Sequence, residues 1–454
     1  MANNPSNAAG EGAPQRPGRT VDPVLSSGSM GNGEREGLGF PLWLATACIF
    51  FSAGVGTGGW VASIPRICRD FALSTAALGT GLPAIAGGSL IATVFVPLVV
   101  KRIGAARASI FCAILFMFSV VGPTLSGGFP ILILPFLALG ITCGATEICM
   151  NAYASAAEQT RGRPVMSSFH ASQTVGMLVG VGLGGAIAGL GGSTTSGAIG
   201  AAALMGMSLI IATIIMWQRN QFRQVPEAPA AAKVARDASL APAVSAASSS
   251  PPTAVIARMR SFMTLPKIPA AVLVLGITLG IASLMQNGVA DWGGVYCVRV
   301  LQLSDALAGS GFSCLLVAIV FSRLVGDSLV ARLGPIVIIQ CGAVLVAVGY
   351  VTVWLAPSVL VACLGFIVVG LGLGNLNPVI FGLLGRASSH PAKAISMGMA
   401  INYLCAMAGP VLIGFLAECY GLRQAFLGLV VAAMLVATVL ATLIKRTGVA
   451  RSGP

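Results

Sequence analysis

One acidic side chain inside an apolar stretch is the residue best suited to chemistry in this sequence. Thirteen Asp and Glu residues occur among 454, and nearly all lie in tails, loops or the ends of apolar segments. Glu147 is the exception. A charge near a bilayer centre costs roughly 2.5 to 3.5 kcal/mol, and desolvation favours the neutral carboxyl. Glu147 could therefore take up a proton on one side of a membrane and release it on the other, or it could be a protonated side chain that is hydrogen-bonded between helices.

Polar side chains accompany Glu147 at helical spacing. Asn151 follows four residues later, so we expect it on the same helical face, where it could hold a substrate hydroxyl, orient the carboxyl or join two helices. His170 is one of only two His and aligns with Gln173 in the next apolar segment. The pair predicts a polar stripe on an otherwise apolar helix.

The second half of the chain supplies further amides. Asn287 lies one turn before Asp291, and Asn377 directly precedes Pro378. The proline removes a backbone donor and favours a helix break, which is tolerated at membrane depth where it lines a cavity. Asn377 is therefore a candidate substrate ligand, with Asn287 near the path and Asn402 adding hydrogen bonds.

Two tryptophans have alternative interpretations. Trp60 could stack on the face of a sugar or lie in the aromatic belt at the membrane surface. Trp292, with Asp291, is expected to anchor the outer membrane interface rather than to contact substrate.

The composition excludes an ordinary soluble protein. Hydrophobic residues make up 56% of the chain and charged residues 9%, with 58 Gly and a net charge of +13, whereas a globular domain carries about 25% charged residues. The chain must face lipid, and its glycines favour closely packed helices over a barrel with a polar lumen. The eleven Cys form no CxxC motif or Cys/His cluster, so we expect no metal site.

Breaks made by charges, Gly/Pro pairs and polar runs divide the chain into twelve apolar stretches, and a helix needs about 20 residues to cross a bilayer. We place these spans at residues 41–64, 76–100, 106–125, 130–156, 167–190, 195–217, 269–289, 304–327, 335–355, 357–384, 394–417 and 424–444. The predicted all-α fold has a cytoplasmic tail (1–40), a six-helix bundle (41–217), an Ala/Pro/Ser-rich linker (218–268), a second six-helix bundle (269–446) and a final tail (447–454).

The basic residues predict the orientation. Of the 26 Lys and Arg residues, 22 fall in connections on the side of the N-terminus, and the other side holds Arg66, Arg69, Arg299 and Arg423. Because positive residues accumulate on the cytoplasmic side, we expect both termini in the cytoplasm and the protein in the inner (plasma) membrane. The same rule explains the positive charge without a nucleic acid as partner.

The two halves share landmarks at a nearly constant offset. The matched residues are Arg102 and Arg332, Gly104 and Gly334, Gly140 and Gly370, Gly144 and Gly374, and Glu147 and Asn377 at 230, and Gly180 and Gly409 at 229. Agreement over several elements indicates an internal duplication. Transporters with parallel halves bind substrate between them near the midplane.

Residues 40–446 thus resemble the major facilitator superfamily, whose pattern is two six-helix bundles, a basic central loop and a short basic connection after span 2. The resemblance implies that this connection, and its counterpart after span 8, act as gate latches. Arg102 and Gly104 match the motif, although Lys101 stands where Asp is expected. Asp327 and Arg332 belong to the better preserved copy.

Residues 147–153 (EICMNAY) and 167–170 (SSFH) resemble the fucose-permease branch, in which a Glu and an Asn share this arrangement on span 4. Related bacterial members, one associated with rhizopine genes, resemble RPVMSSFHA and GVADWGGVY. The resemblance implies a substrate or proton-relay role for His170, with an interfacial histidine as the alternative. Span 1 lacks the acidic residue of fucose permease, so a two-carboxylate mechanism does not transfer directly.

These features predict a monomeric secondary transporter that rocks two halves around a central polar site. Protons couple through Glu147, with His170 nearby, and the solute is a small polar organic molecule, a sugar or polyol by resemblance. We expect no cofactor and no enzymatic activity, since no nucleotide loop or catalytic pair occurs. The alternatives are proton-driven efflux of a drug or metabolite, weakened by Val181 at the position where drug antiporters have Pro, and a non-transporting membrane sensor.

Overall fold

The computed structural model describes residues 32–161, 165–218, 268–388 and 391–449. They contain twelve helical stretches that are long and apolar enough to cross a membrane. The predicted all-α fold with twelve spans is therefore confirmed. Most of the predicted tails and linker lies outside the described residues, at 1–31, 219–267 and 450–454, while the first helix already begins inside the predicted tail, at Asn32.

The helices fall into two groups that follow each other along the chain. The first group comprises α1 (Asn32–Asp70), α2 (Thr75–Gly81), α3 (Pro83–Ile103), α4 (Ala105–Val121), η1 (Gly122–Leu125), α5 (Phe129–Arg161), α6 (Met166–Gly189) and α7 (Thr194–Gln218). The second comprises α11 (Ala270–Arg299), η2 (Asp305–Leu307), α12 (Ser310–Leu333), α13 (Pro335–Leu355), α14 (Val359–Leu373), α15 (Leu376–Arg386), α16 (Pro391–Tyr420), α17 (Leu422–Leu435), η3 (Val436–Leu440) and α18 (Ala441–Arg446).

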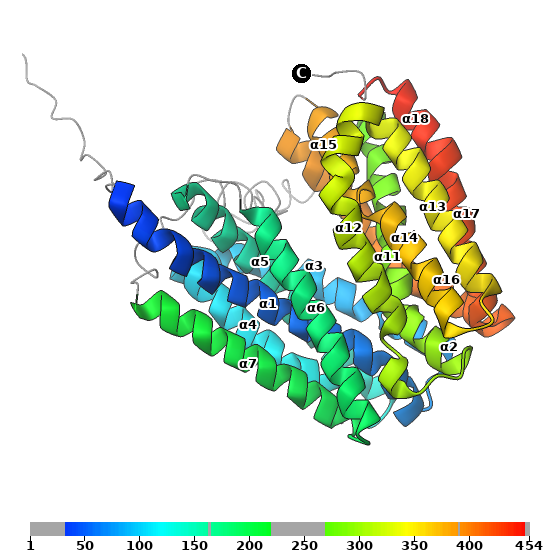
Figure 1. Cartoon of the computed structure of the whole chain (residues 1–454), viewed down its shortest axis with the longest axis horizontal. Coiled ribbons are helices and arrows are strands. Elements are labelled where there is room, and N and C mark those ends of the chain that lie inside the picture. The colour runs from blue at the N-terminus through cyan, green and yellow to red at the C-terminus, as the bar shows by residue number, and fades with distance from the viewer. Residues whose placement is uncertain (1–31, 162–164, 219–267, 389–390, 450–454) are drawn as a thin grey trace, which may run out of the picture.

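The two groups lie apart at one end of the molecule and meet at the other (Figure 1). We call the end that holds the start of α1 and the end of α18 the terminal end, and the opposite end the far end. At the far end α2 packs on α16, and α6 packs on η2. The two halves therefore touch through reciprocal elements, the second span of one half and the fifth span of the other.

Internal packing repeats between the halves, as the duplication predicts. α1 packs on α6 as α11 packs on α16, and α3 packs on α5 as α12 packs on α14. A Cβ at Gly140 would collide with the carbonyl oxygen of Ile85, and one at Gly370 would lie 2.5 Å from the carbonyl oxygen of Leu315. Ile85 and Leu315 are again 230 residues apart, so the same close backbone approach occurs in each half.

The connections after the second and eighth spans adopt one conformation. Gly104 ends α3 with φ 80° and ψ 155°, and Gly334 ends α12 with φ 80° and ψ 160°. Residues with a Cβ rarely adopt this region, which explains why a glycine recurs at each turn. The repeat seen in the sequence is therefore a repeat of backbone geometry.

The predicted break in the tenth span is confirmed. α14 ends at Leu373 and α15 begins at Leu376, with Asn375 between them. Pro378 is the third residue of α15, in the first turn, where its missing N–H removes no intrahelical bond. The proline therefore begins a new helix after the break.

The seventh span is longer than predicted, and one prediction fails as a result. α11 continues to Arg299, ten residues past the predicted end at position 289. Trp292 is 0% exposed and belongs to the apolar core, so its assignment to the membrane interface is wrong. The helix continues because the residues around Asp291 pack against other helices, and a single acidic residue does not interrupt such packing.

Candidate functional site

Glu147 lies midway along α5 and has an unusual environment. It is deep in the molecule, yet its side chain is exposed. Within the described part of the chain its carboxyl has no hydrogen-bond or ion-pair partner, and Tyr403 on α16 of the other half lies within electrostatic range. The sequence-level alternative, a carboxyl hydrogen-bonded between helices, is therefore not what this conformation contains.

A second acid on the same helix provides a contrast. Glu158 Oε2 accepts hydrogen bonds from the backbone N–H groups of Val165 and Met166 at 2.8 and 2.9 Å. It thereby satisfies donors at the start of α6 that would otherwise lack partners. Glu158 has a structural role, whereas Glu147 has none that the described contacts reveal.

Asn151 bonds to the backbone rather than to the carboxyl. Its Nδ2 donates to the main-chain carbonyl of Glu147 at 2.8 Å, one helical turn earlier, and the residue is half-buried. This bond fixes the amide beside Glu147 and leaves its Oδ1 without a described partner. Substrate contact through that oxygen stays a prediction.

His170 and Gln173 form the polar stripe that the sequence predicts on α6. His170 Nδ1 and Gln173 Oε1 lie 3.2 Å apart and share a hydrogen bond. The imidazole also meets the ring of Phe50 edge-on, with centroids 5.3 Å apart, and Arg323 of the other half lies within electrostatic range. His170 is half-buried and Gln173 is buried, so the pair is held in place from within the first half.

The break between α14 and α15 is anchored by an asparagine that the sequence argument did not select. Asn375 Nδ2 donates to both the carbonyl and the hydroxyl of Ser322 on α12, at 2.9 and 3.0 Å. Asn377, the predicted ligand, is half-buried, and its Oδ1 is buried without a partner in the described residues. Asn375 therefore positions the break, whereas Asn377 keeps an acceptor oxygen that a substrate could use.

Two other predicted ligands lie on α11 and α16, which pack together. Asn287 is half-buried and makes no described hydrogen bond. Asn402 is 9% exposed, and its Oδ1 lacks a partner among the described residues. Asp291, one turn from Asn287, is half-buried and deep in the molecule, so Glu147 is not the only acid inside the membrane spans.

Trp60 lies in the apolar core of the first half. It is 8% exposed, and its ring meets Phe136 edge-on with centroids 5.3 Å apart. In this conformation packing accounts for the residue, and stacking on a sugar stays a prediction.

The predicted gate-latch residues lie at the terminal end. Arg102 and Arg332 are exposed in the last turns of α3 and α12, next to Gly104 and Gly334. No ion pair from either arginine reaches the other half in the described ranges, in keeping with the separation of the halves at this end. The side chain of Asp327 lies outside what the structure describes.

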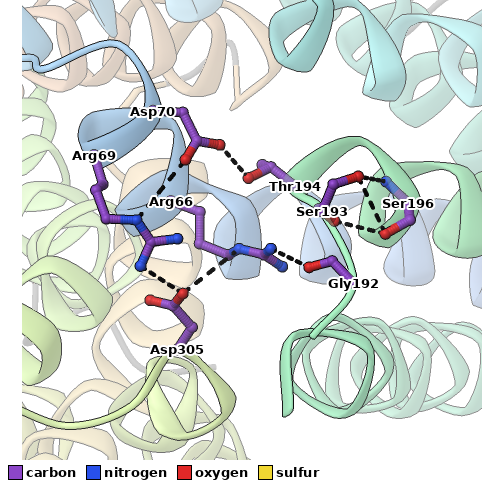
Figure 2. A network of polar contacts seen from close by, with 8 residues as sticks. All are labelled: Arg66, Arg69, Asp70, Gly192, Ser193, Thr194, Ser196 and Asp305. Carbon is purple, nitrogen blue, oxygen red and sulfur yellow. Dashed lines mark hydrogen bonds and ion pairs between the residues drawn. The ribbon is translucent and has the colours of Figure 1, made fainter. Parts of the chain in front are cut away.

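The far end holds charged residues that the sequence argument did not assign to the site. Asp305, at the start of η2, pairs with Arg69 (Nη1 to Oδ2, 2.6 Å) and Arg66 (Nε to Oδ2, 3.7 Å) from the end of α1 (Figure 2). Arg299, at the end of α11, donates to the carbonyl of Leu73 at 2.8 Å. Each contact joins one half to the other.

Glu418 on α16 also joins the two halves at the far end. Glu418 Oε2 accepts from the Thr75 hydroxyl at 2.7 Å and from the Ala76 N–H at 3.1 Å. Gly79 and Gly414 meet next to it, since a Cβ on Gly414 would lie 2.8 Å from the Cα of Gly79. These contacts, which we call the seal of the far end, combine ion pairs with close backbone packing.

A signal for this seal was present in the sequence. Only four of the 26 basic residues lie on the side opposite to the N-terminus, and three of them, Arg66, Arg69 and Arg299, contact the other half at the far end. The fourth, Arg423, donates to the carbonyl of Ala356 within its own half. The small number of basic residues on that side is therefore the sequence feature that marks these contacts between the halves.

Comparison with known proteins places this architecture in a family. The model of the Major Facilitator Superfamily matches residues 42–353 and 294–454, which together cover nearly the whole membrane core. The chain belongs to the major facilitator superfamily. The superfamily prediction is thus confirmed, and the closer resemblance to the fucose-permease branch stays a prediction.

Relatives and solved structures agree with this assignment. An uncharacterized MFS-type transporter of Yersinia pestis is 27% identical over 84% of this chain and 91% of its own. An uncharacterized transporter of Sinorhizobium fredii is 27% identical over 89% and 98%. A mutant of the nucleoside transporter NupG superposes with a TM-score of 0.69 at 12% identity, covering 88% of this chain and 99% of that one. A D-xylose-proton symporter superposes with a TM-score of 0.62 at 18% identity, covering 88% and 97%.

Proposed function

We propose that this transporter moves a small polar organic solute together with protons by alternating access. The observation that carries the proposal is the unpartnered carboxyl of Glu147 deep in the molecule. An acidic side chain inside a membrane span is a functional site by default, because placing a charge there is costly and no described hydrogen bond or ion pair offsets the cost.

Alternating access would let the carboxyl of Glu147 carry protons across the membrane. A carboxyl that faces each side of the membrane in turn can bind a proton where protons are abundant and release it where they are scarce. Tyr403 of the opposite half lies within electrostatic range of Glu147, so movement between the halves would change the surroundings of the carboxyl. This coupling needs two conformations that bind the proton with different affinity.

The arrangement of the halves fits one of those conformations. Contacts join the halves at the far end, and the helices lie apart at the terminal end (Figure 1). We propose that both termini are cytoplasmic, from the distribution of Lys and Arg, and that the membrane is the plasma membrane. The conformation is then inward-facing, and the far end is the closed outer gate.

Neutral hydrogen-bonding groups support a polar, uncharged solute. The candidate ligands are amides, namely Asn151, Gln173, Asn287, Asn377 and Asn402. Amides both donate and accept, as a sugar or polyol requires. Two solved structures of similar fold are a nucleoside transporter and a D-xylose-proton symporter, and nucleosides and xylose are hydroxylated solutes. We propose a monomer whose halves are residues 41–217 and 269–446.

Proton movement in proteoliposomes tests the proposal. Purified full-length protein is reconstituted with an internal pH dye and exposed in turn to sugars, polyols, nucleosides and amphiphilic drugs. We expect at least one hydroxylated solute to drive proton movement. Solute flux without proton movement would contradict coupling, and proton movement driven only by drugs would support efflux instead.

A further inference from the structure

A single carboxylate connects the charged groups of the two halves at the far end. Asp305 belongs to the second half, and both of its partners, Arg66 and Arg69, lie in the last two turns of α1 in the first half. The same oxygen, Oδ2, faces both guanidinium groups, at 3.7 and 2.6 Å (Figure 2). Separation of the halves at this end must break both ion pairs together.

The other bonds of this network stay within the first half. Arg66 donates to the carbonyl of Gly192, and Asp70 accepts from the hydroxyl of Thr194 (Figure 2). Gly192 lies in the turn between α6 and α7, and Thr194 begins α7. The end of α1 is therefore tied to its own half, and both arginines would move with that half while Asp305 moves with the other.

Arg66 and Arg69 differ in the contacts that they would keep after the halves separate. The Arg69 side chain is 56% exposed and has Asp70 within 3.8 Å, so it keeps water and a carboxylate after the halves separate. The Arg66 side chain is 9% exposed, and its Nε has no hydrogen-bond partner in the described structure. Removing the partner of a buried charge costs much more than removing the partner of an exposed one.

We propose that Asp305 is the latch of the outer gate and that Arg66, rather than Arg69, sets its strength. Loss of either Asp305 or Arg66 shifts the protein toward the state that is open at the far end. This inference rests on the alternating access proposed above, and it assigns positioning residues that control how often the outer gate opens.

A native cysteine reports on this gate. Cys68 is 1% exposed and lines a cavity of about 370 Å³ at the far end together with Arg69, Leu73, Val295 and Arg299. Because the cavity lies between α1 and α11, separation of the halves would expose the thiol. Cys419, which is exposed beside Glu418 at the same end, must first be removed.

The test measures labelling of Cys68 by a membrane-impermeant maleimide applied from outside cells that express the full chain with Cys419→Ser. A Cys68→Ser strain gives the background. We expect Asp305→Asn and Arg66→Gln each to raise the labelling rate at least fivefold, and the double variant to add less than twofold more. Arg69→Gln should change the rate less than twofold, and Asp305→Glu should restore the parent rate.

Asp70→Asn is the matched control, because its contacts lie within the first half and an amide oxygen can still accept from Thr194. Size-exclusion profiles identify variants that misfold. An unchanged rate in Asp305→Asn would overturn the latch, as would an equal rise in Asp70→Asn. The assay needs no substrate, so a raised rate in a protein that moves no solute would retain the latch and refute the transport proposal.

Discussion

At the scale of single residues, the acidic side chains differ in the partners that they have. Glu158 accepts two backbone N–H groups at the start of α6, and Asp305 pairs with two arginines across the halves. Glu147 and Asp291 have no hydrogen-bond or ion-pair partner in the described ranges. Contacts within the structure account for Glu158 and Asp305, whereas no described contact accounts for an acid at Glu147 or Asp291 inside a membrane span.

We therefore expect Asp291, like Glu147, to take part in transport. We expect Asp291→Asn to lower solute uptake at least tenfold, because the substitution keeps the shape and removes a titratable group on the same face of α11 as Asn287. Uptake of the identified solute into proteoliposomes measures the effect, with Asp291→Glu as the matched control. Full uptake by Asp291→Asn would mean that the carboxyl has no part in transport.

The sequence predicted which residues are unusual but not all of their partners. Glu147 stands out because one acid inside an apolar stretch is visible without a structure. The sequence favours the membrane surface for Asp291 because the predicted span ends ten residues before α11 does, and it gives no sign of the role of Asp305, whose partners lie 236 and 239 residues away in the chain. Contacts between distant segments follow from packing, which composition and spacing do not encode locally.

At the scale of elements, the turns after the second and eighth spans are the clearest product of the duplication. Gly104 and Gly334 share the same positive φ and nearly the same ψ. Apart from the adjacent residues, no described heavy atom lies within 4 Å of a Cβ added at either glycine. Backbone strain alone should therefore determine the effect of a substitution.

We expect Gly104→Ala and Gly334→Ala each to cost about 1–3 kcal/mol in the free energy of unfolding, the range for a residue held in this region of φ and ψ. The midpoint of thermal unfolding in detergent measures it. Gly87→Ala is the control, since Gly87 is helical with open space around its Cβ, and it should be neutral or stabilising by about 0.5–1 kcal/mol. Equal effects at Gly87 and Gly104 would contradict the argument from backbone strain.

At the scale of the whole molecule, the two halves meet through small residues on corresponding helices. A Cβ on Gly185 of α6 would lie 2.5 Å from the carbonyl oxygen of Ala306, and one on Gly414 of α16 would lie 2.7 Å from that of Thr75. Gly185 and Gly414 are 229 residues apart, the same offset that relates Gly180 and Gly409. Their contact with the opposite half was not predictable, because it depends on how the two halves dock.

Larger side chains at these positions should hold the far end open. We expect Gly185→Val to reduce solute uptake at least tenfold while the size-exclusion profile stays that of the parent, because the clash lies between the halves. Gly182→Val is the matched control on the same helix, since nothing lies within 4 Å of that Cβ. If Gly182→Val reduced uptake to the same extent, packing of α6 within its own half would explain the effect instead.

The central claim is that Glu147 couples solute movement to protons, and comparing exchange with accumulation in Glu147→Gln tests it most directly. Exchange of labelled for unlabelled solute needs no net proton transfer, whereas accumulation driven by a pH gradient does. We predict that Glu147→Gln keeps exchange and loses accumulation at least tenfold, while Glu158→Gln, whose amide oxygen can still accept at the start of α6, keeps both. Accumulation at the parent rate in Glu147→Gln would contradict the account.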